Sequence, residues 1–145
     1  MVVVDTNVLV YAADRASPHQ AACYAWLENR RVQHDAWYVT WNVVYEFLRV
    51  VTHRKVLRQP WTLASAWNFI DTLTASPGLG FLLPTDRHAD VAAAVIDELP
   101  ETSGNLIHDM HTAVLMREHG IARICTRDTD FHRFPFLEVI DPLRA

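Results

Sequence analysis

Residues 1–7 read MVVVDTN, a short apolar run that ends in the carboxylate of Asp5. Four apolar residues without a polar alternation predict a strand that is buried on both faces. A carboxylate directly after such a strand is unusual, because burying an unpaired charge is costly. It is tolerated where the strand ends at a crevice that holds positive charge, and in open α/β sheets ligands bind at that edge.

Three further acids are candidates to meet Asp5 at this crevice: Glu46, Asp109 and Asp128. Asp128 follows a second buried run, residues 121–125, and so repeats the layout of a strand followed by an acid. Glu46 and Asp109 are each expected near the start of a helix. In a parallel sheet all four side chains then reach one crevice at the carboxyl ends of the strands.

The length and composition of the chain limit which classes of protein it can belong to. The 145 residues, half of them hydrophobic, predict a single domain over residues 1–145. No apolar run approaches the ~20 residues that a membrane span needs, and no basic leader is present, so we expect a cytoplasmic protein. Cys23 and Cys125 fit no metal or redox spacing and are expected to be reduced core thiols. The net charge of −4 disfavours a simple electrostatic nucleic-acid binder, unless the acids hold cations.

Strands and helices are expected to alternate, which predicts an α/β fold with a mostly parallel central sheet flanked by helices. Further strands are expected at residues 36–39, 81–83 and 137–140. The expected helix starts are a capping box at Ser17 and Gln20, a cap at Thr40, a start at Pro60, a cap at Thr85 or Asp86, and a cap at Asn105. Gly120 is expected to stop the last helix.

Four carboxylates at close range repel one another, so either some are protonated or a divalent cation neutralises them. Ligation by oxygen alone suits Mg²⁺ or Mn²⁺. Such an ion orients and deprotonates a water, and a second ion can hold the leaving oxygen of a phosphodiester. Thr6, Asn7 and Thr126 are expected to hold the acids in place through hydrogen bonds.

The stretch VVDTNVL at residues 3–9 resembles the opening of PIN-domain nucleases, and TRDTDF at residues 126–131 resembles their closing motif. The size and the ending, residues 134–142, resemble VapC toxins of type II toxin–antitoxin pairs. The resemblance implies a PIN-like fold and a Mg²⁺- or Mn²⁺-dependent endoribonuclease whose partners are an antitoxin and a second copy of the chain. On matching positions it implies these catalytic and metal-binding acids: Asp5, Glu46, Asp109 and Asp128. Asp130 is also acidic, and three alternatives remain for the fourth acid: Asp128 alone, Asp130 in its place, or both together.

Basic residues follow Glu46 without an intervening acid: Arg49, Arg54, Lys55 and Arg58. We expect them to contact RNA phosphates on either side of the cut. The alternative is a solvated helix end and loop. Trp67 is expected in the core, whereas Trp61 has no obvious core position.

Two other functions are alternatives. His108-Asp109 with His111 suggests an HD-type metal-dependent phosphohydrolase, but that fold is all-helical and this sequence predicts several strands. A non-catalytic PIN-like module that binds RNA or protein is the other alternative, and the complete set of acids argues against it.

Overall fold

The computed structural model describes residues 1–145 and contains one parallel sheet of five strands in the order β3-β2-β1-β4-β5. The strands are β1 (Val2–Val4), β2 (Trp37–Val39), β3 (Leu79–Phe81), β4 (Arg123–Cys125) and β5 (Glu138–Ile140). The prediction of an α/β fold with a parallel central sheet is confirmed.

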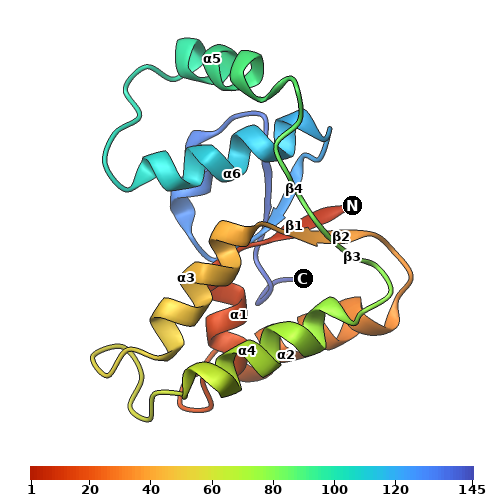
Figure 1. Ribbon diagram of the computed structural model, residues 1–145, viewed down its shortest axis with the longest axis vertical. Helices are drawn as coiled ribbons and strands as arrows, with labels where there is room; N and C mark the ends of the chain where they lie inside the picture. The colour runs from red at the N-terminus through yellow and green to blue at the C-terminus, as the bar shows by residue number, and fades with distance from the viewer.

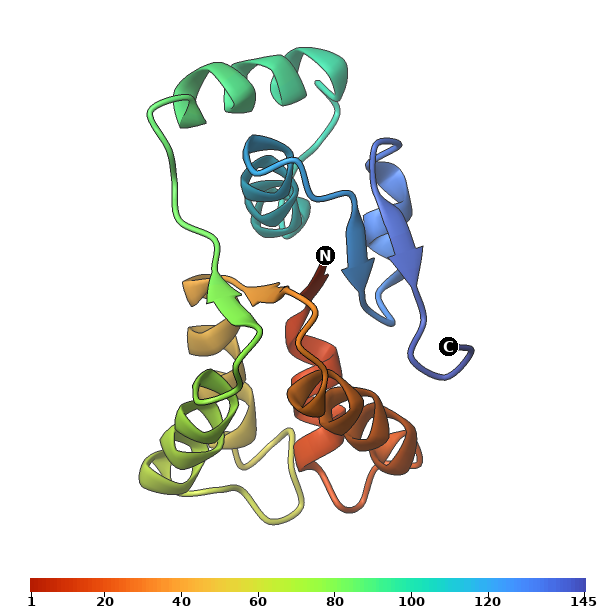
Figure 2. The same cartoon turned by 90° about the vertical axis from the view of Figure 1, so that its right-hand side faces the viewer.

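Helices cover both faces of this sheet (Figure 1). They are α1 (Thr6–Ala13), α2 (Gln20–Val32), α3 (Trp41–Val51), α4 (Leu63–Thr74), α5 (His88–Glu98), α6 (Leu106–Glu118) and the 3₁₀ helix η1 (Thr129–Arg133). The first four lie on one side of the sheet, while α5 and α6 lie on the other (Figure 2). No helix combines the length and the apolar character that crossing a membrane requires.

The first strand separates two hydrophobic cores. Val2 and Val4 pack into the larger core with residues of α1 to α4, and Val3 packs into the smaller one beside Ile124 and Met116. All three valines are almost fully buried. The alternation of side chains along a strand explains this division, and it confirms the prediction that β1 is buried on both faces.

The parallel register brings the ends of β1 and β4 together. Val4 pairs with Cys125, and the Asp5 backbone N–H donates to the Cys125 carbonyl at 3.0 Å. On the other side of β1, β2 leads directly into α3, whose start is capped by the Thr40 hydroxyl accepting from the Val43 N–H at 3.1 Å. Asp5 and Asp128 therefore follow strands that end at the same edge of the sheet, and Glu46 lies on the helix that begins at that edge.

The structure corrects the expected starts of two early helices. The sequence pattern did not predict α1, which follows Asp5 without a break. The capping box at Ser17 is wrong: α2 begins at Gln20, and the Ser17 hydroxyl accepts from the His19 N–H within the preceding turn. The Gln20 side chain donates instead to the Ala12 carbonyl at the end of α1, which the unexpected helix supplies.

Three other starts also differ. Pro60 lies outside α4, because Thr62 is the cap and accepts from the Ser65 N–H at 3.1 Å. Arg87 rather than Thr85 or Asp86 precedes α5, since the Thr85 hydroxyl and N–H both donate to Glu118. Asn105 does precede α6, but its side chain caps nothing. Gly120, at φ +68°, ends α6 as predicted.

The third strand and two tryptophans are also corrected. β3 begins two residues earlier than predicted, where Leu79 pairs with Trp37 and the missing side chain of Gly78 lets the backbone pass close to Asp35. Trp67 is 45% exposed rather than in the core. Trp61 packs instead against the aromatic rings of the larger core, edge-on to Phe47 at 6.3 Å.

Candidate active site

Asp5 is held by hydrogen bonds from three directions. Its carboxylate caps α1 by accepting from the Thr6 backbone N–H at 2.8 Å. The other oxygen accepts from the Asn7 amide at 2.9 Å and from the Thr126 hydroxyl at 2.8 Å. These are the three residues that the sequence predicted to support the acids, and the hydrogen bond made by Thr6 comes from its backbone.

Thr126 and Asn7 extend this network across the sheet edge. The buried Thr126 hydroxyl accepts from the Asn7 amide and from the Asp128 N–H, each at 2.9 Å. The Asn7 oxygen accepts from the Arg127 N–H at 3.0 Å. The segment after β1 and the segment after β4 are thereby fixed to one another.

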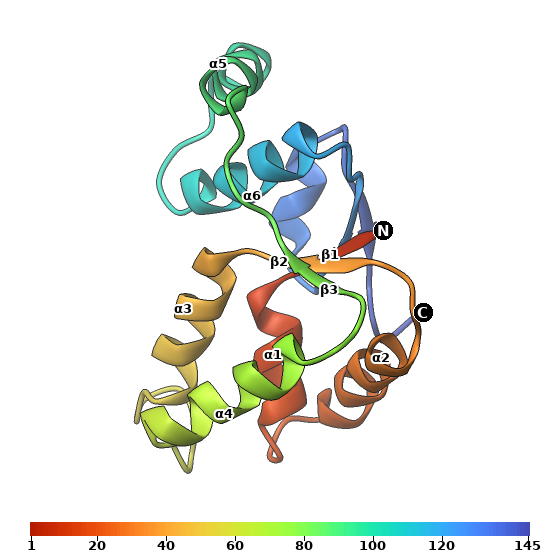
Figure 3. The same cartoon turned by 45° about the vertical axis from the view of Figure 1, so that its right-hand side comes forward.

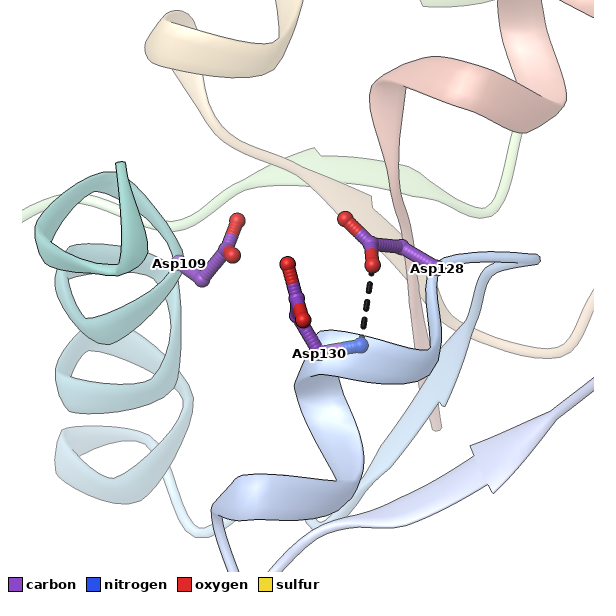
Figure 4. A group of neighbouring side chains, drawn as sticks. All are labelled: Asp109, Asp128 and Asp130. Atoms are coloured by element: carbon purple, nitrogen blue, oxygen red, sulfur yellow. Dashed lines mark hydrogen bonds between the residues drawn. The ribbon is translucent and has the colours of Figure 1, made fainter. Parts of the chain in front are cut away.

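Three aspartates converge beside this network (Figure 4). Asp109 projects from the first turn of α6, and Asp128 caps η1 by accepting from the Asp130 N–H at 2.9 Å. One carboxylate oxygen from each of Asp109, Asp128 and Asp130 lies within 4.8 Å of the others. Asp130 thus lies as close to the other carboxylates of this group as Asp128 does, within the same 4.8 Å.

A single groove of about 1060 Å³ contains all five acids. Its lining includes Asp5, Glu46, Asp109, Asp128 and Asp130. Glu46 differs from the others, because it forms a bidentate ion pair with Arg49, at 2.5 and 3.1 Å. The predicted candidates are therefore brought together, with Glu46 engaged by a cation of the protein itself.

The electrostatics distinguish these acids. Burial raises the pKa of Asp109 to about 7, with smaller contributions from the neighbouring carboxylates, of which Asp128 is the largest. Burial likewise raises the pKa of Asp5, although its hydrogen bonds from Thr126 and Thr6 oppose the shift. The hydrogen bond from Arg49 lowers the pKa of Glu46. Negative charge is thus under-compensated around Asp109 and balanced at Glu46.

This donor set fits a hard divalent cation. The oxygens of Asp109 and Asp130 accept no hydrogen bond from the protein, and the nearest cation to Asp130 is the exposed Arg133 at 4.0 Å. Carboxylates with free oxygens, beside a groove that admits water, are the ligands that Mg²⁺ and Mn²⁺ prefer. Burial and mutual repulsion penalise the charged carboxylates, and a bound cation would remove that penalty.

The predicted basic residues divide into two groups. Arg49 lines the groove, but its guanidinium is bound to Glu46. Arg54, Lys55 and Arg58 are exposed in the loop between α3 and α4 and do not line the groove.

Several groove-lining residues were not predicted from the sequence. Among them are Val10, Tyr11, Asn42, Tyr45 and Val56. Val10 and Tyr11 lie on α1, which was not expected, and the helical spacing of Asn42, Tyr45 and Arg49 on α3 was the available signal for that wall.

The histidines near Asp109 do not form an HD-type centre. His108 lines the groove, whereas His111 bonds to the Asn42 side chain and lies edge-on to His88. The five-stranded sheet also excludes the all-helical fold of that class.

Comparison with known proteins agrees with this geometry. The family model described as the PIN domain matches residues 2–137. Ribonuclease VapC33 of Mycobacterium tuberculosis is 32% identical over 144 residues, covering 99% of both chains. Ribonuclease VapC43 of the same species is 35% identical over 144 residues, covering 99% of this chain and 96% of the relative.

Solved structures share the fold at lower identity. M. tuberculosis VapC20, described as a sarcin-ricin loop cleaving toxin, superimposes with a TM-score of 0.67 at 16% identity, covering 97% of this chain and all of that one. VapBC2 from Rickettsia felis, bound to a promoter DNA fragment, gives 0.69 at 18% identity, covering 97% and 98%. The chain therefore belongs to the PIN domain family, among its VapC-like members.

Proposed function

We propose that this protein is a Mg²⁺- or Mn²⁺-dependent endoribonuclease, the toxin of a type II toxin–antitoxin pair, acting as a single domain in the cytoplasm. The observation that carries the proposal is the convergence of Asp109, Asp128 and Asp130 beside Asp5 in one groove. The VapC relatives that match along the whole chain are named ribonucleases, which supports RNA as the substrate.

In this proposal Asp5, Glu46, Asp109 and Asp128 are the catalytic acids and metal ligands, with Asp130 as a further ligand. These acids would hold a divalent cation, which would supply Lewis-acid chemistry by activating a water and compensating charge on the phosphate. Thr126, Asn7 and the Thr6 N–H orient Asp5. No side chain in the groove is needed as a nucleophile.

The proposed macromolecular partners are an antitoxin and a second copy of the chain. Structures with the same fold are described as toxin–antitoxin complexes, including one from Klebsiella pneumoniae, which supports the antitoxin. Exposed aromatic side chains, Trp41 at 41% and Tyr45 at 66%, are of the kind that anchors interfaces and support association between copies. Light scattering of the purified protein across a concentration series tests the dimer.

The ribonuclease is tested by incubating the purified protein with an RNA mixture in Mg²⁺, in Mn²⁺ and in EDTA. We expect cleavage with either metal and none in EDTA, with Asp97→Asn on the exposed face of α5 as an active control. Metal should also raise the melting temperature, because a ligand that binds only the folded state stabilises it. Metal-dependent stabilisation without cleavage would favour the non-catalytic module, and turnover of small phosphoesters alone would favour the phosphohydrolase.

A further inference from the structure

A second group of polar side chains lies outside the groove, where α5 packs on α6. The α5 helix lies on the far side of α6 from the sheet (Figure 3). His88 begins α5, and its ring meets the ring of His111 on α6 edge-on, with ring centres 5.9 Å apart. Neither histidine lines the groove of the aspartates. Two imidazoles thus lie against one another at a helix interface that the proposed function does not use.

A buried carboxylate orients the His88 ring. The side chain of Glu118, in the last turn of α6, is fully buried. It accepts from the Thr85 N–H at 2.9 Å, from the Thr85 hydroxyl at 2.8 Å and from Nδ1 of His88. Because a carboxylate only accepts hydrogen bonds, Nδ1 of His88 carries the ring proton. In the neutral ring Nε2 then presents its lone pair, and no protein group donates to it.

The His111 ring is oriented at the same atom. Its Nδ1 bonds to the side-chain amide of Asn42, near the start of α3. The nitrogen and oxygen of this amide exchange places by a half-turn, and with the oxygen toward the ring Nδ1 of His111 carries the proton. Each histidine is thus held at Nδ1 and free at Nε2. Imidazole ligands of metal ions are held in this way, with the second ring nitrogen bonded to a carboxylate or another acceptor.

The spacing of the two rings fits a shared ion. A transition-metal ion lies about 2.0–2.1 Å from a ligating imidazole nitrogen, so two rings that bind one ion have centres about 5–6 Å apart. The observed separation of 5.9 Å lies in that range. Both side chains are half-buried, so water reaches the pair and can complete the coordination.

We propose that His88 and His111 bind one divalent transition-metal ion through their Nε2 atoms, at a site separate from the aspartates. Imidazole nitrogen favours Zn²⁺, Ni²⁺ and Cu²⁺, whereas the oxygens of the groove favour Mg²⁺ and Mn²⁺. The negative charge of Glu118 behind His88 makes that ring a stronger ligand. The ion joins the start of α5 to the middle of α6 and stabilises the packing of the two helices. The inference does not depend on the proposed ribonuclease.

The first test titrates Zn²⁺ into the protein, prepared without a histidine tag, in excess Mg²⁺ to occupy the carboxylates. Calorimetry should show one Zn²⁺ bound per chain. His88→Gln and His111→Gln should each weaken this binding by at least about ten-fold, a loss seen even when only an outer partner of a ligand is removed. Zn²⁺ should raise the melting temperature of the wild type but not of these variants. The matched control is His34→Gln, which changes an exposed histidine between α2 and β2.

The second test needs no variant and therefore stands even if a histidine change unfolds the protein. Cu²⁺ replaces Zn²⁺, and electron paramagnetic resonance of the bound ion shows whether nitrogen ligates it. Imidazole ligands split the signal through their nitrogen nuclei, whereas an ion among the aspartates has oxygen ligands alone. We expect the splitting of two nitrogens in the wild type and its reduction in His111→Gln.

The outcomes decide the histidine site without involving the ribonuclease, because neither histidine lines the groove. Zn²⁺ that binds the wild type and both histidine variants equally, or a Cu²⁺ signal without nitrogen splitting, would overturn the site. Loss of Zn²⁺ binding in Asp128→Asn but not in His88→Gln would overturn it too, because the ion would then lie among the aspartates. His88 would in these cases serve only to neutralise the buried Glu118.

Discussion

Acids follow two neighbouring strands, and they differ in how many hydrogen bonds they accept from the protein. Asp5, after β1, accepts three hydrogen bonds from the protein and is part of the connection between two strand ends. Asp128, after β4, accepts one, and the adjacent Asp109 accepts none. The comparison separates a carboxylate that the fold holds from carboxylates whose oxygens stay free for a ligand. All of them are proposed metal ligands, but Asp5 should in addition contribute to the stability of the fold, whereas Asp109 and Asp128 should contribute mainly to metal binding.

The largest effect should come from removing one of the free carboxylates. Asp128→Asn should reduce RNA cleavage by about 100-fold or more, because it removes a ligand charge worth several kcal/mol. Its melting temperature without metal should be equal to or above that of the wild type, since like-charge repulsion is relieved. Cleavage assays in Mn²⁺ and thermal melts in EDTA measure the two effects, with Asp97→Asn as the control. If Asp128→Asn cleaves RNA at the wild-type rate, Asp128 is not a required metal ligand and the ion is assigned to Asp109 and Asp130.

The held carboxylate should show the opposite pattern. Thr126→Val keeps the buried shape but removes the hydroxyl that donates to Asp5 and accepts from Asn7 and Asp128. The change leaves the Asp128 N–H without a partner and removes one hydrogen bond each from Asp5 and Asn7, which should lower the melting temperature by about 2–10 °C. Cleavage should fall less than in Asp128→Asn. The control is Thr72→Val, whose hydroxyl is exposed on α4. An unchanged melting temperature would mean that the two strand ends are joined by other interactions.

A smaller effect should appear in the pH dependence of stability. The pKa of Asp109 is raised from its ordinary value of 3.8 to about 7, so the folded protein binds more protons at this site than the unfolded chain over that interval. The free energy of unfolding without metal should therefore fall as pH rises from about 4 to about 7 and level off above. Asp109→Asn should flatten this slope, while Asp97→Asn should not. Thermal melts in EDTA across that pH range measure it, and identical slopes in all three proteins would contradict the burial-driven shift.

The strand ends were the most predictable part of the molecule. A short apolar run followed by an acid is a strong local signal, and the parallel register then brings Asp5 and Asp128 together without further information. The α1 helix was not predicted. Asp5 follows a strand and was therefore interpreted as a candidate ligand, so its second role, as the cap of the helix that begins at Thr6, was missed. Without that helix, the placement of Val10 and Tyr11 in the lining of the groove was not predictable.

Side-chain pairing was predicted less well than position. The spacing of Glu46 and Arg49 correctly places both near the groove, but the same spacing lets them form an ion pair. Trp67 shows a similar limit: a helical stripe predicts which residues share a face, but which of two faces packs on the core depends on how α4 lies against α3. The close approach of Asp109 to Asp130 depends on the 3₁₀ helix η1, a short element that the local sequence does not predict.

The smallest effect should come from the exposed basic residues Arg54, Lys55 and Arg58, which neither hold the acids nor line the groove. We expect Arg54, Lys55 and Arg58 to bind phosphates at a distance from the cut, because they follow the end of α3 that lies away from the sheet edge. Arg54→Gln with Arg58→Gln should weaken RNA binding in Ca²⁺ and flatten its dependence on salt by about 1.4 units, the value for two phosphates of a single strand that are no longer neutralised. Turnover at saturating RNA should stay near that of the wild type, since no group at the aspartates is changed.

The matched control for this pair is Arg123→Gln with Arg144→Gln, which removes the same charge from β4 and the C-terminal segment, away from the loop between α3 and α4 (Figure 2). If both pairs flatten the salt dependence equally, the loop acts only through net charge. If the loop variant loses turnover at saturation while its melting temperature is unchanged, these arginines position the scissile phosphate. In that case the loop between α3 and α4 would bind the substrate at the reacting phosphate, and the ligand-binding residues of the protein would not be confined to the groove.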